Sequence, residues 1–132
     1  MRCSPRLLPE NFSDDDLLGG AKDSDELFFV QVKSCHPDRS RSFLLHAKHE
    51  AWQNAAPNRF VVFVWLGSTK TNEPPRYWIA RARDVGRACV THPAHGTHNW
   101  ERRFHVSKDH RLPAEWENAW ELFNPYRWVG SS

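Results

Sequence analysis

The run from Arg59 to Leu66 constrains the fold most strongly, because nearly all of its residues are β-branched or aromatic. A strand with one face in water alternates apolar and polar side chains. An unbroken apolar run is instead typical of a central strand that is covered on both faces. The sequence therefore predicts a sheet that contains this strand and has further elements packed over both sides.

Further segments predict the neighbours of this strand. Leu27–Ser34 has the composition of a second buried strand, and Leu17 and Leu18 precede it across a turn-rich stretch, so the two form a predicted hairpin. Residues 76–82 alternate well enough to form a strand antiparallel to the 59–66 strand. Residues 84–88 predict a short helix, and a short strand is expected around Phe104.

Two longer helices are also predicted. One begins at Ser40 or Ser42 and ends before Pro57, because apolar residues recur there at helical spacing. The other covers residues 113–123 and carries three aromatic residues and one alanine on one face: Trp116, Ala119, Trp120 and Phe123. The expected fold is α/β (α+β), a small mixed sheet of about four strands with a crossover helix and a C-terminal helix.

The length of 132 residues fits one domain. Residues 1–13 are expected to be an irregular arm, 14–82 the core, and 83–132 a loop-rich extension with a helix. No apolar run approaches the roughly 20 residues of a membrane span, and the N-terminus lacks the pattern of a signal peptide. Three scattered cysteines without a Cys-x-x-Cys pair favour a reducing, cytoplasmic setting. Most of the seven tryptophans are expected to fill the core.

The strand at 27–34 carries Gln31 and Lys33 two positions apart. Side chains alternate along a strand, so this amide and this ammonium share one face of an otherwise apolar run. Polar side chains on a buried face of a sheet need a hydrogen-bond partner or a functional role. An acidic run, Asp14, Asp15 and Asp16, lies upstream of the hairpin.

An acidic residue, a short hairpin and then Gln-x-Lys resembles the PD-(D/E)XK nuclease superfamily, in the restriction-endonuclease-like variant with Gln that Mrr-like enzymes show. The order strand, strand, helix, strand, strand over residues 14–82 is similar to the core of that superfamily from its second strand onward. The residues before Asp14 are too few for both the helix and the strand that usually precede the acid. The resemblance therefore implies a trimmed fold, an edge completed by another chain, or a start site that omits part of the natural protein.

The resemblance implies Mg²⁺ or Mn²⁺ as cofactor and DNA as substrate. Asp16 would be the anionic ligand, with Asp15 in reserve and Asp14 not excluded. The Gln31 side-chain oxygen and the Val32 carbonyl would add neutral ligands, and Lys33 would orient the attacking water. A second carboxylate is expected from Glu50 on the following helix. The neutral Gln leaves the site one anion short, which lowers the expected metal affinity.

Charge is distributed unevenly: residues 1–27 hold three basic and seven acidic side chains, whereas the later chain is basic. Arg39, Arg41 and Lys48, near the start of the predicted crossover helix, are the expected phosphate contacts, because the N-terminus of a helix attracts anions. An exposed sheet edge would also seek a partner strand, so a homodimer or a partner subunit is expected.

Two other interpretations remain open. The chain can be a non-catalytic relative or fragment of the same fold that binds nucleic acid or protein and keeps Lys33 as a phosphate contact. His92, His95 and His98 suggest a zinc-binding module, but Pro93 and Gly96 separate them and no cysteine accompanies them, so loop histidines are the better interpretation.

Overall fold

A computed structural model describes residues 6–7, 17–20, 27–35, 42–91, 100–106 and 111–126. Its main sheet has five strands in the order β1 (Arg6–Leu7), β2 (Leu17–Gly20), β3 (Leu27–Cys35), β5 (Arg59–Trp65) and β6 (Arg76–Arg81). Only the β3–β5 pair is parallel, and the other neighbours are antiparallel. Among the described residues no helix is long and apolar enough to cross a membrane.

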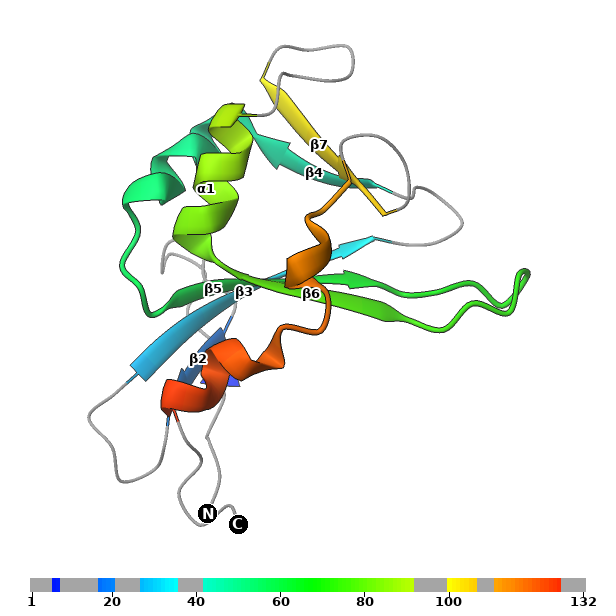
Figure 1. Cartoon of the computed structure of the whole chain (residues 1–132), viewed down its shortest axis with the longest axis horizontal. Helices are drawn as coiled ribbons and strands as arrows, with labels where there is room; N and C mark the ends of the chain where they lie inside the picture. Colours follow the sequence, from blue (N-terminus) through cyan, green and yellow to red (C-terminus); the bar gives the residue numbers. More distant parts are fainter. Residues whose placement is uncertain are drawn as a thin grey trace.

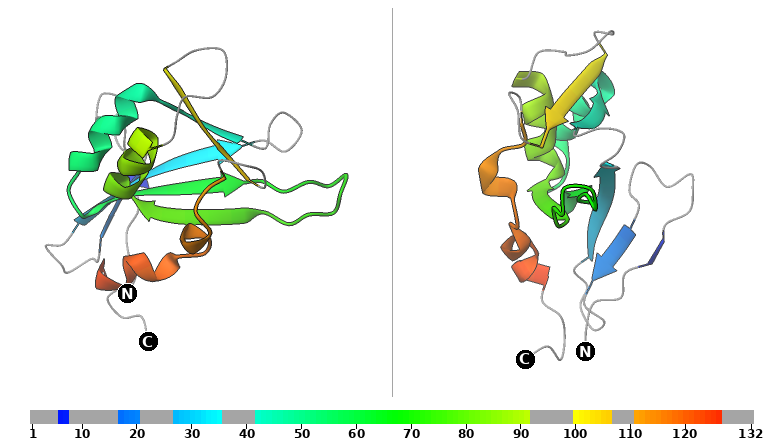
Figure 2. Two further views of the ribbon diagram at one scale, coloured as in Figure 1. Left: turned by 45° about the horizontal axis from the view of Figure 1, so that its top comes forward. Right: turned by 90° about the vertical axis from the view of Figure 1, so that its right-hand side faces the viewer.

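The other elements lie on both sides of this sheet (Figures 1 and 2). The 3₁₀ helix η1 (Ala47–Asn54), helix α1 (Ala82–Thr91) and a ribbon of β4 (Ser42–His46) with β7 (Glu101–His105) cover one face. The short 3₁₀ helix η2 (Ala114–Trp116) also contributes to that side. A second 3₁₀ helix, η3 (Trp120–Tyr126), packs on the opposite face.

The predicted central strand is confirmed as β5. It pairs with β3 on one side and β6 on the other, and its side chains reach two separate apolar clusters. Val61, Phe63 and Trp65 point to the cluster under α1 and the ribbon, whereas Phe60 and Val62 point to the cluster under η3. The β2–β3 hairpin, the antiparallel β6, the helix around 84–88 and the strand around Phe104 are confirmed as well.

The helix predicted from Ser40 or Ser42 is wrong over its first part, which is strand β4. Phe43 and Leu45 are buried and the intervening Leu44 is exposed, which is the period of a strand. Phe43 packs against Phe63 with ring centroids 5.1 Å apart. This segment pairs with β7, about 60 residues away in the chain, and the hydrogen bonds of this pairing favour a strand over a helix.

The continuous helix predicted over 113–123 is also wrong. Its aromatic residues contact opposite faces of the sheet: Trp116 stacks on Phe63, while Phe123 packs on Phe28 and Phe60. One straight helix cannot cover both faces. The chain therefore breaks at Asn118, where φ is 56°, a left-handed value that Asn tolerates better than most residues.

The residues at this break pair with the first half of the outer edge of β6. Asn118 N donates to the Tyr77 carbonyl, and Glu117 forms an isolated bridge with Trp78. Arg76 donates two hydrogen bonds to the Glu117 carboxylate, at 2.8 and 2.9 Å. These bonds lower the pKa of Glu117 and raise the pKa of Arg76, while burial opposes both shifts. The partly exposed pair therefore holds the C-terminal segment against the sheet.

Three smaller differences concern strands and tryptophans. The sheet has five strands where about four were expected, with the β4–β7 ribbon in addition. The expected irregular arm contains β1, which pairs with β2. Core filling is confirmed for Trp65 and Trp78, which are almost fully buried, whereas Trp100 and Trp120 are 40% and 46% exposed.

The two buried cysteines, Cys35 and Cys89, are expected to be unreactive in the folded protein. Cys89 lies in the core, and burial raises the pKa of its thiol to about 11. At pH 8 only about one thiol in a thousand is then ionised, and Cys35 is also buried. In a Cys3→Ser variant, a thiol reagent is expected to leave Cys35 and Cys89 unmodified until urea unfolds the protein. Reaction of both in native buffer, at the rate of free cysteine, would contradict this packing.

Candidate active site

Strand β3 places Gln31 and Lys33 on one face of the sheet, as their spacing predicts. Gln31 is in register with Val61 and Lys33 with Phe63. Neighbouring residues in register point to the same side, and Val61 and Phe63 belong to the cluster under α1 and the ribbon. The amide and the ammonium are therefore both on the covered face, and both are half-buried.

The oxygen of the Gln31 side chain is one of the buried polar side-chain atoms for which the described residues provide no hydrogen-bond partner. An unsatisfied buried polar atom destabilises a fold by about 1–3 kcal/mol, so such atoms are rare in native proteins. An amide oxygen is a suitable donor to Mg²⁺ or Mn²⁺.

A second cation on the same face was missed by the sequence analysis. Arg59 is in register with Phe29, two positions before Gln31, and its guanidinium lies over the Phe29 ring at 4.5 Å from the centroid. Phe29, Gln31 and Lys33 alternate onto one face of β3. Arg59 and Lys33 therefore give this face two positive groups. The signal for Arg59 is the β3–β5 register, which the sequence alone does not specify.

The acidic residues proposed for the site, Asp14, Asp15 and Asp16, lie outside the described residues. The described part of β2 begins at Leu17, which pairs with Val30, the residue before Gln31. Val32, whose carbonyl is a proposed ligand, continues β3 in register with Val62. The identity of the anionic ligand thus stays a prediction.

Glu50, the candidate second carboxylate, has a structural partner. It lies on η1 and forms an ion pair with Arg102 of β7, with Oε2 2.7 Å from Nη2. The guanidinium Nε of Arg102 also donates to the Cys89 carbonyl, at 3.2 Å. This contact ties η1 to α1 and β7, and it explains Glu50 without a metal.

The histidines do not form a metal site within the described part of the chain. His49 is buried, and its Nδ1 accepts a hydrogen bond from the backbone N–H of His46 at 2.9 Å. His92, His95 and His98 lie outside the described residues. No group of three or more His, Cys, Asp or Glu side chains in the described ranges is arranged to hold a metal.

Of the predicted phosphate contacts, Arg39 and Arg41 lie outside the described residues. Lys48 is exposed on η1. It lies in the first turn of a 3₁₀ helix, because the strand β4 occupies the segment where the α-helix was expected to begin. The exposed ammonium remains able to reach a phosphate.

Comparison with models of known protein families found no match to this chain, and comparison with curated proteins found no significant relative.

Proposed function

We propose that this chain is a metal-dependent DNA endonuclease of the PD-(D/E)XK kind. The observation that carries the proposal is the buried oxygen of Gln31, which accepts no hydrogen bond from the described residues and lies two residues from Lys33 on the same sheet face. Coordination of a divalent ion would satisfy this oxygen, and Lys33 and Arg59 would neutralise a phosphate beside it. A purely structural Gln would be expected to find a hydrogen-bond donor instead.

The arrangement of the strands supports the proposal. The resemblance implies a hairpin that carries the metal site, followed by a crossover to the next strand. Here β2 and β3 form the hairpin, and β4 with η1 leads to β5, parallel to β3. Many functions occur on one fold, so this topology adds weight but does not by itself define a nuclease.

Asp16, the Gln31 side-chain oxygen and the Val32 carbonyl would hold Mg²⁺ or Mn²⁺. Asp16 precedes Leu17 in the sequence, and Leu17 pairs with Val30, the residue before Gln31. The ion would act as a Lewis acid and make a water molecule more nucleophilic. Glu50 is the least favoured ligand, because it would have to leave Arg102.

The side chains of the protein would supply the other functions. Lys33 would position the attacking water and stabilise the negative charge that develops on the phosphate. Arg59 and Lys48, with Arg39 and Arg41, would contact the DNA backbone. Because the proposed substrate is intracellular DNA, a cytoplasmic location and a DNA-bound dimer or partner subunit remain part of the proposal.

Gln31 variants test the proposal through the metal requirement. Nicking of supercoiled plasmid is measured against Mg²⁺ and Mn²⁺ concentration, with EDTA as the blank. Gln31→Glu adds the missing anion and is expected to lower the half-maximal metal concentration about tenfold. Gln31→Leu removes the ligand and is expected to raise it at least tenfold. Gln53→Glu, at an exposed position of η1, is the matched control and is expected to leave it unchanged.

Absence of metal-dependent cleavage by the wild type would overturn the proposal. The same holds if both Gln31 variants cleave with the wild-type metal requirement. A gel-shift titration of the same proteins would then show whether the chain binds DNA without cutting it, which is the non-catalytic alternative.

A further inference from the structure

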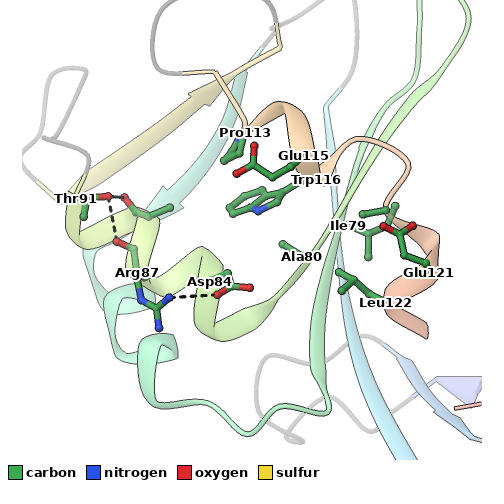
Figure 3. A pocket seen from close by; sticks show the side chains of 12 residues that line it. Ile79, Ala80, Asp84, Arg87, Thr91, Pro113, Glu115, Trp116, Glu121 and Leu122 are labelled. Carbon is green, nitrogen blue, oxygen red and sulfur yellow. Dashed lines mark hydrogen bonds and ion pairs between the residues drawn. The ribbon is translucent and has the colours of Figure 1, made fainter. Parts of the chain in front are cut away.

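A hollow of about 530 Å³ lies at the outer edge of β6, away from Gln31 and Lys33 in the fold. Figure 3 shows α1 with Asp84 and Arg87 on one wall and η2 with Trp116 on the other. Ile79 and Ala80 of β6 line its floor. The rim residues Arg87, Thr91, Glu115 and Glu121 are exposed, so the hollow is a surface groove. We call it the β6 groove.

The β6 groove carries an excess of negative charge. Three carboxylates line it, from Asp84, Glu115 and Glu121, against the single guanidinium of Arg87. Arg87 is already paired with Asp84, at 3.5 Å. No ion pair joins Glu115 or Glu121 to any residue that the structure describes. Two carboxylates that pair with no described cation therefore border an apolar floor, in a protein whose formal net charge is +2.

These carboxylates do not converge on one point. No group of three acidic, His or Cys side chains in the described ranges can hold a metal ion together. A compact cation would neutralise only part of the groove. An occupant with separated positive charges, each near its own carboxylate, fits the spacing better.

Trp116 adds a reason for a side chain as the occupant. Its ring is partly buried, and it stacks nearly parallel to Phe63, with an angle of 7° between the rings. The ring is thereby held fixed in the wall of the groove. Lysine and arginine stems pack along such apolar surface and keep their charged ends in water near carboxylates.

We propose that the β6 groove binds an extended basic segment of a partner protein, with lysine or arginine side chains that lie over Trp116 and pair with Glu115 and Glu121. A volume of this size is enough for two such side chains. DNA is an unsuitable occupant, because its phosphates would face the same sign of charge. The inference goes beyond the proposed nuclease function and does not depend on it.

Fluorescence anisotropy tests the proposal with a labelled eight-residue peptide of alternating lysine and leucine, titrated with protein at low salt. Binding is expected to weaken about tenfold in the double variant E115Q/E121Q, which loses two surface charge pairs. A Glu73→Gln variant is the matched control, because Glu73 is a carboxylate outside the groove. A peptide of alternating glutamate and leucine is expected not to bind. Circular dichroism checks that each variant is folded.

Three results would overturn the proposal. The first is no binding of the basic peptide by the wild type at protein concentrations up to about 1 mM, the weakest useful affinity for such a contact. The second is equal binding by the wild type and E115Q/E121Q. The third is displacement of the peptide by an equal concentration of spermidine, which would show a general polycation site. Plasmid cleavage by E115Q/E121Q is expected to be unchanged, so failure here does not affect the proposed nuclease site.

Discussion

Lys33→Ala is expected to slow metal-dependent DNA cleavage by a factor of about 100 to 1,000. This is the range that enzymes lose when one group that stabilises transition-state charge is removed. Lys33 shares its sheet face with Gln31, so under the proposed function its ammonium would lie beside the scissile phosphate. The rate is measured as loss of supercoiled plasmid at saturating Mg²⁺ or Mn²⁺.

A control variant and a DNA-binding measurement show whether the loss of cleavage in Lys33→Ala is specific to the reaction. Lys70→Ala removes the same charge from the exposed connection between β5 and β6 and is expected to cleave at the wild-type rate. DNA binding by Lys33→Ala is expected to fall only by a small factor, because other cations keep contact with the phosphates. Cleavage that survives in Lys33→Ala would show that Lys33 takes no part in the reaction, and it would point to a contaminating nuclease.

Gly86→Ala is expected to lower the free energy of unfolding by about 2 kcal/mol. A methyl group at Gly86 of α1 would come within 2.3 Å of the Gln53 backbone nitrogen and 2.6 Å of the Trp52 carbonyl carbon. These are backbone atoms of η1, so the two helices would have to move apart. In an exposed helix, Gly→Ala would raise the free energy of unfolding by about 0.5–1 kcal/mol. Helix propensity alone would therefore predict a change of the opposite sign at Gly86.

Urea denaturation measures this change, with Val90→Ala as the control on the same helix. Val90 is 49% exposed, and its truncation is expected to change stability by less than about 0.5 kcal/mol. A Gly86→Ala protein that is as stable as the wild type would mean that α1 does not approach η1 so closely. The β4–β7 ribbon and η1 would then need a different position over the sheet.

The sequence predicted the elements whose signal is local. The unbroken run 59–65 indicated a central strand, and the spacing of Gln31 and Lys33 was enough to place both on one face. Prediction from the sequence failed where contacts with residues far away in the chain determine the secondary structure. Ser42–His46 has an ambiguous apolar pattern, and its pairing with β7 selects the strand. The C-terminal aromatic residues fit one helical face, but they contact opposite sides of the sheet.

The site was predictable only in part, for the same reason. Gln31 and Lys33 follow from alternation along β3. The partner of Glu50 is Arg102, 52 residues away, and the proximity of Arg59 to this face depends on the parallel β3–β5 register. The β6 groove is assembled from α1, β6, η2 and η3, so no local pattern indicates it.

The most direct test of the central claim is to locate Mn²⁺ by anomalous X-ray scattering in crystals of this protein soaked with the ion. A peak is expected about 2.0–2.4 Å from the Gln31 side-chain oxygen, with a carboxylate of Asp14, Asp15 or Asp16 as a further ligand. A Gln31 oxygen that instead accepts a protein hydrogen bond, with Mn²⁺ absent from this face, would contradict this claim.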